Sequence, residues 1–350
     1  MTIDEIVQQD WQWLQGGDAD GAIVVSTRVR LARNLAEHTF VSQLSEQDRT
    51  LVERKLITAI QKTPKGRHFT RLDVGGMDEL EQAMLVESHL ASPELIKETG
   101  AHSVMISPDG RTSLMLLEED HLRIQMLSGG FNLQETWQEI DALDDQLEQH
   151  MVYAWDEHYG YLTACPTNVG TGMRVSVMLH LPALVATRQF ARMYQSLQKV
   201  SLTVRGTYGE GTQAFGNFYQ ISNQTTLGIS EPEILQQVHD VIQSVINYEL
   251  RARKFLLEEG RDSLIEDIQK NLDTLRTASS LSMEETMHCL SIVRLGIALD
   301  LLPGIPMETI NQLLIRTQPA HIQWIYGGVI SSLDTNVLRS QFLQRYLSKF

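Results

Sequence analysis

The sequence is poor in cysteine and has no long hydrophobic run, and each absence excludes a class of protein. Its 350 residues include only two cysteines, Cys165 and Cys289, which are too few for a disulfide framework. Reduced thiols, as in the cytoplasm, are therefore expected. No stretch approaches the roughly 18 apolar residues that a membrane-spanning helix requires, and the acidic first residues lack the basic and apolar regions of a signal peptide. We expect a cytoplasmic protein that does not have a membrane as a partner.

Runs of lysine and arginine are also absent. The formal net charge is −15, and hydrophobic residues make up 42% of the chain. This balance disfavours nucleic acid and anionic membranes as direct partners. The acidic charge is compatible with basic partners. It is equally compatible with a protein whose charge only keeps it soluble. The apolar fraction is ordinary for a globular protein with a substantial core.

Glycine divides the chain into two parts. Of the 23 glycines, only five follow residue 230. Before that point, 103–107 and 112–117 flank a Pro-Asp-Gly turn and predict a β-hairpin. Further strands are predicted at 122–127, 161–164 and 202–204, helices are predicted at 46–60 and 137–158, and 174–180 is ambiguous between the two. Because strands and helices do not alternate regularly, the fold class is α+β.

The second part, 231–350, is predicted to be helical. Ser230 and Glu233 form a capping box, with proline early in the first turn, and Gly260 is a plausible stop. Similar starts at Ser263 and Ser282 open two more helices, and a last helix begins near Asp334. We expect residues 1–230 to form a catalytic domain and 231–350 an all-α domain that serves dimerisation and substrate docking.

Five arginines stand near loops and glycines in the first part. Planar, permanently charged guanidinium groups suit the oxygens of a polyphosphate. Glycines at 170, 172, 206, 209 and 211 would let backbone N–H groups approach a nucleotide closely. The arginines of this predicted clamp are Arg28, Arg30, Arg123, Arg174 and Arg205.

Two glutamates and a cysteine indicate what lies on the other side of that phosphate. An arginine nitrogen is a poor nucleophile, so an enzyme that phosphorylates it needs a carboxylate to orient it and take its proton. Glu119 and Glu210 could grip opposite edges of a guanidinium, and Cys165 could add negative charge as a thiolate.

Each of these features also has an ordinary structural reading. Surface arginines, an exposed acidic turn at 118–120, a buried cysteine and a half-buried His89 would account for the same residues. Val175 stands where a dinucleotide fingerprint needs its third glycine or alanine, and no Walker A loop or protein-kinase signature is present. Residue types and spacing alone therefore indicate only a phosphate-handling α+β enzyme.

Taken in order, several longer segments resemble one family. They are Ser26-Thr-Arg-Val-Arg-Leu-Ala-Arg-Asn34, His89-Leu-Ala-Ser-Pro-Glu-Leu95, Glu118-Glu-Asp-His-Leu-Arg-Ile-Gln125, Cys165-Pro-Thr-Asn-Val-Gly-Thr-Gly-Met-Arg174 and Arg205-Gly-Thr-Tyr-Gly-Glu210. The chain is identified by them as similar to the phosphagen (guanidino) kinases, which include arginine and creatine kinases. Within that family it most resembles the bacterial protein arginine kinases, over about residues 20–350. That closer likeness rests on 208–211, 220–224, 226–228, 293–296 and 318–323.

The resemblance implies a fold and a set of site residues. The fold is an antiparallel sheet flanked by helices, of the guanidino kinase/glutamine synthetase catalytic type. Glu119 resembles the catalytic base, Glu210 its partner on the guanidinium and Cys165 the reactive cysteine. ATP is the implied cosubstrate, with Mg²⁺ carried mostly by the nucleotide, so no metal-ligating residues are predicted. The implied nucleotide contacts are Ser26, Thr27, Arg28, Val29, Arg30, His89, Arg123, Arg174, Val175, Ser176, Val177, Met178, Arg205, Gly206, Thr207, Tyr208, Gly209 and Glu210.

The resemblance also implies partners. Too few residues precede Ser26 for the helical N-terminal domain that shapes the small-substrate pocket in arginine and creatine kinases, so protein substrates with exposed arginines are expected. Such an enzyme marks proteins, including a heat-shock repressor, with phosphoarginine for a AAA+ protease, and it works as a homodimer with a zinc-binding activator protein. A small-molecule guanidino kinase and a non-catalytic adaptor that still binds ATP are the alternatives.

Two departures from the family pattern have consequences. Leu117 replaces the usual asparagine before Glu118, and we expect a hydrophobe to pack there with altered rather than lost activity. The family's phosphoarginine-binding Arg-Asp-x-x-Arg-Ala motif is reduced to Thr335-Asn-Val-Leu-Arg-Ser340. Neither Thr335 nor Asn336 replaces the lost charges, so feedback by phosphoarginine is predicted to be weak or absent. The structural alternative is that this segment is only the start of a helix.

Overall fold

An eight-stranded antiparallel sheet forms the centre of the molecule. The structure is a computed structural model that describes residues 2–15, 22–197, 201–206 and 214–350. The strand order is β2-β3-β4-β5-β1-β8-β10-β9, and a separate hairpin pairs β6 with β7. The predicted α+β class, with an antiparallel sheet flanked by helices, is confirmed. The strands are β1 Val24–Arg33, β2 Thr70–Asp73, β3 Ser103–Ile106, β4 Thr112–Leu116, β5 Leu122–Gly129, β6 Trp155–Asp156, β7 Gly160–Tyr161, β8 Met173–His180, β9 Leu202–Gly206 and β10 Phe218–Asn223.

Several sequence predictions can be compared with these strands. The hairpin of β3 and β4 forms as expected, with Ser103 opposite Leu116. The ambiguous segment 174–180 is strand β8, which lies between β1 and β10. The prediction of a strand at 161–164 is wrong beyond Tyr161, because the chain there turns into the loop that carries Cys165.

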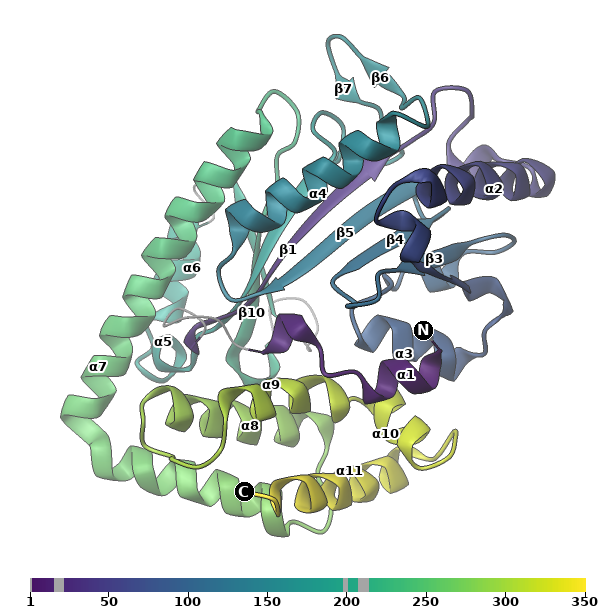
Figure 1. Ribbon diagram of the computed structural model, residues 1–350. Coiled ribbons are helices and arrows are strands. Elements are labelled where there is room, and N and C mark those ends of the chain that lie inside the picture. Colours follow the sequence, from purple (N-terminus) through teal and green to yellow (C-terminus); the bar gives the residue numbers. More distant parts are fainter. Residues whose placement is uncertain (1, 16–21, 198–200, 207–213) are drawn as a thin grey trace.

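The helices cover both faces of the sheet (Figure 1). The predicted helix at 137–158 ends ten residues early, because the chain after His150 is extended and Ala36 N donates to Val152 O. The helices are α1 Ile3–Gln8, α2 Glu46–Lys62, α3 Glu79–Glu87, α4 Leu133–Glu148, α5 Pro182–Ala186, α6 Phe190–Leu197, α7 Glu231–Thr277, α8 Met283–Ala298, α9 Met307–Arg316, α10 Pro319–Ile325 and α11 Ser332–Leu347.

The predicted helix stop at Gly260 is confirmed as a kink. The backbone leaves the helical region there, with φ −152° and ψ 34° at Gly260, so α7 consists of two helical segments that meet at this residue, and the second runs to Thr277. The bend turns α7 from the side of the sheet to its lower end in Figure 1. The starts at Ser230 and Ser282 are confirmed, since Glu233 and Glu285 accept hydrogen bonds from the backbone N–H of those serines.

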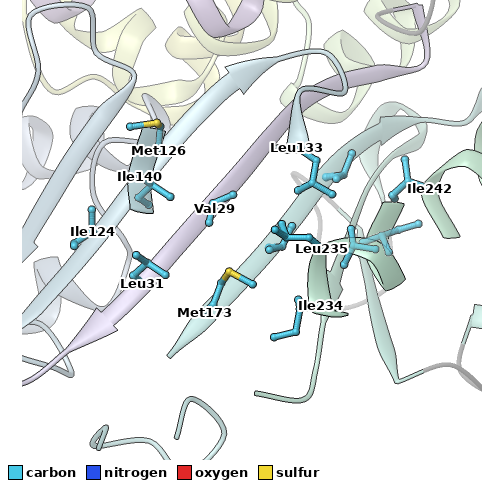
Figure 2. Close-up of a cluster of buried hydrophobic side chains, with 14 of the residues drawn as sticks. Val29, Leu31, Ile124, Met126, Leu133, Ile140, Met173, Ile234, Leu235 and Ile242 are labelled. Atoms are coloured by element: carbon cyan, nitrogen blue, oxygen red, sulfur yellow. The ribbon is translucent and has the colours of Figure 1, made fainter. Parts of the chain in front are cut away.

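Two hydrophobic cores lie on opposite faces of the sheet. The first packs α2, α4 and the first half of α7 against residues such as Val29, Leu31 and Ile124 (Figure 2). The second packs α1, α3 and α8–α11 against the lower part of the other face, and it includes Trp11 and Trp13. The remainder of that second face is open to ligands.

Candidate active site

The pairing register of the strands brings the five predicted arginines to one face of the sheet. Arg30 on β1 lies opposite Arg174 on β8, and Arg205 on β9 lies opposite Gln220 on β10. Because side chains alternate between faces, the side chains of Val29, Leu31 and Arg33 on β1 point the other way. All five arginines line one cavity of about 580 Å³ together with Glu119 and Cys165. Its remaining lining residues are Leu31, Ala32, Pro93, Glu94, Thr167, Asn168, Gly172, Gly206 and Gln220.

Alternation also narrows the predicted nucleotide contacts. Val29, Val175 and Val177 are fully buried in the core on the opposite face, so any contact of these three residues with a nucleotide would have to come from their backbone. Thr27 is also buried, and its hydroxyl donates to Gly130 O at 2.8 Å. Thr207, Tyr208, Gly209 and Glu210 lie outside the described residues.

The cavity concentrates positive charge that few protein groups compensate. Burial, with repulsion from Arg174 and Arg123, lowers the pKa of Arg28 to about 10. Burial and the neighbouring arginines also hold the pKa of Arg30 well below its usual value, and burial with repulsion from Arg205 and Arg123 lowers that of Arg174. The Nε atoms of Arg30 and Arg174 have no hydrogen-bond partner among the described residues. Buried, unpaired cations are costly, so this face is built to receive an anion.

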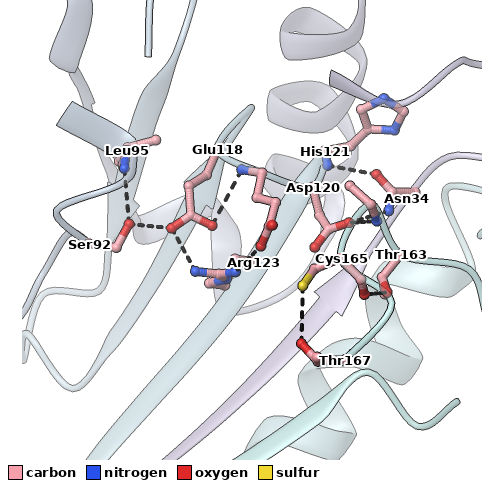
Figure 3. A network of polar contacts seen from close by, with 12 residues as sticks. Asn34, Ser92, Leu95, Glu118, Asp120, His121, Arg123, Thr163, Cys165 and Thr167 are labelled. Carbon is pink, nitrogen blue, oxygen red and sulfur yellow. Dashed lines mark hydrogen bonds and ion pairs between the residues drawn. The ribbon is translucent and has the colours of Figure 1, made fainter. Parts of the chain in front are cut away.

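The two consecutive glutamates take different positions. Glu118 is fully buried and accepts hydrogen bonds from Arg123 Nη1 at 2.6 Å and from the Ser92 hydroxyl. Figure 3 shows the Glu118 carboxylate between Ser92 and Arg123. Glu119 is 43% exposed and lines the cavity, with one oxygen 3.4 Å from Arg123 Nη2. Burial raises the pKa of Glu119, while Arg123 lowers it. The acidic segment is therefore no exposed turn: one carboxylate holds Arg123 and the next is presented to ligand.

The residues after Glu119 fix this turn in place. Asp120 accepts from Asn34 Nδ2 at 2.6 Å and from the Ala164 N–H at 2.7 Å, which ties the turn to the cysteine loop. Leu35 N donates to Nδ1 of His121, whose Nε2–H donates to Thr39 O. Burial lowers the pKa of His121 to about 4, so the ring is neutral. Sequence reasoning missed these supporting roles, although Asn34 and Asp120 stand inside the segments that carry the resemblance.

Leu117 packs as expected but adopts an unusual backbone. Its side chain is fully buried in the first core, and its φ of 59° lies in the left-handed region. Its N–H donates to His121 O at 2.9 Å, which closes the turn that carries Glu118 and Glu119. Leucine is disfavoured in this region by roughly 1–2 kcal/mol, and the asparagine usual in the family would tolerate it better.

Cys165 lies beside Glu119 on the cavity wall. Its Sγ is 3.0 Å from Thr167 Oγ1, and a hydrogen bond from the thiol acts to lower the pKa of Glu119. The side chain is half-buried and lines the cavity. The reading of Cys165 as a small buried hydrophobe is therefore not what the structure has.

A smaller cavity of about 60 Å³ adjoins the arginine face at His89. The His89 ring meets that of Trp13 edge to face, with centroids 5.4 Å apart, and its Nε2 has no partner among the described residues. Burial and Arg28 lower its pKa to about 3, so it is neutral. Four more predicted contacts line this space: Ser26, Arg28, Ser176 and Met178.

Comparisons with known proteins place the chain in a family. Residues 51–252 match the profile of the ATP:guanido phosphotransferase C-terminal catalytic domain, and residues 261–350 match that of the protein-arginine kinase McsB C-terminal domain. A protein-arginine kinase of Symbiobacterium thermophilum is 42% identical over 99% of this chain and 100% of its own length. The chain belongs to the ATP:guanido phosphotransferase family, among its protein-arginine kinases. A protein-arginine kinase of Brevibacillus brevis is also 42% identical, over 99% of this chain and 98% of its own.

Solved structures of this family share the fold. The duplicated taurocyamine kinase of Schistosoma mansoni, with bound transition-state analogue components, matches with a TM-score of 0.61 and 23% identity over 75% of this chain and 39% of that duplicated chain. A lombricine kinase matches with a TM-score of 0.58 and 25% identity over 74% of this chain and 76% of its own. The guanidino kinase fold predicted from the resemblance is confirmed.

No described helix is long and apolar enough to cross a bilayer. No group of three or more histidine, cysteine, aspartate or glutamate side chains in the described ranges is arranged to hold a metal ion.

Proposed function

We propose that this protein transfers the γ-phosphoryl group of ATP to arginine side chains of other proteins. The observation that carries the proposal is the cavity in which five arginines, with little compensating charge, meet the exposed carboxylate of Glu119. The arginines suit a polyphosphate, and the Glu119 carboxylate suits a cationic acceptor. The cavity would therefore hold a nucleotide triphosphate next to a substrate guanidinium.

The arginine face binds the triphosphate in this proposal. Arg28, Arg30, Arg174 and Arg205 neutralise its oxygens, and Arg123 is held in place by buried Glu118. The neutral ring of His89, with an unpaired ring nitrogen in the adjoining small cavity, suits the uncharged nucleoside end. Gly206 lines the main cavity and can approach the phosphates through its backbone.

Glu119 acts as the base. Its carboxylate accepts a proton from the substrate guanidinium, whose nitrogen then attacks the γ-phosphorus in line while the bond to the ADP oxygen breaks. A raised pKa makes Glu119 a stronger proton acceptor than an ordinary glutamate. Cys165 adds a polar group beside the acceptor, and Glu210 is the second carboxylate in this proposal. Mg²⁺, bound with the nucleotide, would supply further charge neutralisation.

Relatives that share this chain's full length support a protein as the acceptor. Those at 42% identity are named protein-arginine kinases, whereas the taurocyamine and lombricine kinases share the fold at lower identity. We further propose a cytoplasmic homodimer with a catalytic domain at 1–230 and a helical docking domain at 231–350. Its phosphoarginine would mark targets, such as a heat-shock repressor, for a AAA+ protease with the help of an activator protein.

The test is ³¹P NMR of the full chain with MgATP and either an arginine-rich folded protein or free L-arginine. We expect an acid-labile N–P signal on the protein substrate alone. A signal on free arginine would instead identify a small-molecule guanidino kinase. Silence with both substrates, together with retained ATP binding, would indicate an adaptor.

A further inference from the structure

A further cavity lies outside the candidate active site, and one of its walls includes Leu35, whose N–H donates to His121. It has a volume of about 480 Å³ and runs between α2, the loop at 35–38 and the segment 150–152. We call it the α2 groove. It shares no lining residue with the arginine cavity. Its lining residues are Leu35, Glu37, His38, Leu51, Arg54, Lys55, Leu56, Thr58, Ala59, Lys62, His150, Met151 and Val152.

The groove exposes apolar side chains to solvent. Leu35 and Leu56 are buried beneath it, while Leu51 is 47% exposed and Val152 70% exposed. Each lies on a different wall, Leu51 on α2 and Val152 beyond the end of α4. Apolar side chains gathered in a concave surface typically mark a binding site.

The rim of the groove is cationic, although the chain as a whole carries a net charge of −15. Arg54, Lys55 and Lys62 stand on it against a single carboxylate, Glu37. Nζ of Lys55 lies 3.4 Å from Glu37 Oε2 and 2.9 Å from His38 Nε2, so its charge already has partners. Neither Arg54 nor Lys62 forms an ion pair with a described residue, and both are exposed. These two charges are available to an anionic partner.

We propose that the α2 groove binds an acidic segment of a partner protein. Apolar side chains of that segment contact Leu51 and Val152, and its carboxylates pair with Arg54 and Lys62. Charge complementarity selects an acidic rather than a basic segment. The apolar walls favour a polypeptide over a nucleic acid, which binds chiefly through its phosphates.

One wall of the groove is hydrogen-bonded to the turn that carries Glu119. Leu35 N and Thr39 O hold both ring nitrogens of His121, at 2.9 and 2.8 Å. The His38 ring meets the His121 ring edge to face, with centroids 6.2 Å apart. His121 stands two residues after Glu119. A segment bound in the groove therefore acts on the support of Glu119, a consequence that rests on the proposed function.

Binding is tested first without ATP, so that its result does not depend on catalysis. The probe is a fluorescein-labelled peptide that alternates glutamates with two leucines, titrated with the full chain by fluorescence anisotropy at low salt. We expect Arg54→Glu/Lys62→Glu to weaken binding about tenfold or more, and Leu51→Ser/Val152→Ser to weaken it several-fold. The matched control, Arg251→Glu/Lys270→Glu, reverses one arginine and one lysine on exposed positions of α7 and should bind as wild type does.

Three results would overturn the proposal. One is that wild-type protein does not bind the peptide, and another is that the α7 control loses as much affinity as the groove variant. The third is that a peptide with serines for leucines binds as tightly, which would reduce the site to a general anion surface. Circular dichroism of each variant verifies folding.

The link to the catalytic turn is tested by the imidazole N–H resonance of His121 in ¹⁵N-labelled protein. We expect peptide binding to shift this resonance in wild type and in the α7 control, but not in Arg54→Glu/Lys62→Glu. An unmoved resonance at saturating peptide would remove the connection to Glu119. A shift without any phosphoryl transfer would leave the groove proposal intact and count against the proposed function instead.

Discussion

The protein buries arginines in two regions, and their surroundings differ sharply. In the interior, Arg33 donates from Nε and Nη2 to Asp144 at 2.9 and 2.7 Å. Arg253 pairs with Glu249 at 2.9 Å. In the candidate site, by contrast, Arg30 and Arg174 leave Nε unpaired among the described residues. A buried arginine whose donors are satisfied supports the fold, whereas one whose donors are left open indicates a ligand.

The same contrast separates Glu118 from Glu119 in the candidate site, and it gives the largest expected effect. Glu119→Gln should abolish measurable phosphoryl transfer, a loss of at least about 10²–10⁴-fold, because the amide cannot take the proton. The free energy of unfolding should change little, since Glu119 is 43% exposed. Transfer is measured with MgATP and a protein substrate, and stability by urea unfolding.

Glu118→Gln is the matched comparison for that prediction. It removes the buried charge that holds Arg123 at 2.6 Å, so both stability and activity should fall. An active Glu119→Gln variant, or one that unfolds as easily as Glu118→Gln, would remove Glu119 from its role as base.

Two arginines only three residues apart on β1 test the contrast directly. Arg33→Met leaves Asp144 buried without its partner, so the free energy of unfolding should fall by about 3–5 kcal/mol. Arg30→Met removes an uncompensated buried charge, so stability should hold or rise, while transfer falls by about 10²-fold or more. Urea unfolding and transfer assays on both variants decide the matter. A stability loss in Arg30→Met equal to that in Arg33→Met would end the distinction.

Two buried histidines extend the comparison to pH. Burial lowers the pKa of His121 to about 4 and that of His89 to about 3, against about 6.5 in an unfolded chain. Below pH 6.5 the unfolded chain therefore takes up protons that the folded protein does not. Their contribution to stability is complete above that pH and is lost as the pH falls towards 4, by up to about 1.4 kcal/mol per pH unit for each group.

His121→Gln separates the two histidines. We expect the slope of unfolding free energy between pH 6.5 and 4.5 to decrease by the share of one group, in urea titrations across that range. Nε2 of His89 has no hydrogen-bond partner in the part of the chain that the structure describes, so His89→Gln should reduce the same slope and also weaken ATP binding. An unchanged slope in both variants would show that other groups govern the loss of stability at acidic pH.

How far the sequence predicts this site depends on the range of the contacts involved. The quoted segments and the nearby glycines are enough to single out Arg28, Arg30 and Arg174, although the sequence leaves 174–180 ambiguous between strand and helix. Bonds such as Asn34 to Asp120 join residues 86 positions apart and depend on strand register, which no local pattern fixes. Gly260, by contrast, is a local signal, and it marks the kink between the two helical segments of α7. The two flanks of the kink pack against different cores.

The smallest expected effect concerns Arg339, a buried arginine whose donors, like those of Arg33, have partners within the protein. Its Nε donates to Thr317 O at 2.8 Å, and its Nη1 donates to Leu281 O and Asn336 Oδ1 at 2.8 and 2.7 Å. The Thr335 hydroxyl donates to Ser331 O within the first turn of α11. Because these groups already have partners, free phosphoarginine should change the transfer rate by less than about twofold, a free-energy difference near the RT scale.

Isothermal titration of phosphoarginine into the full chain, with Glu119→Gln to prevent turnover, measures this directly. We expect no heat of binding at the C-terminal region. Phosphoarginine could bind either in the arginine cavity or at Arg339 on α11. Arg30→Met separates these two sites, because it weakens binding in the arginine cavity and leaves α11 unchanged. Micromolar binding that survives Arg30→Met but disappears in Arg339→Met would place Arg339 with the open arginines. It would mean that a guanidinium with three backbone and side-chain acceptors can still exchange them for a phosphate.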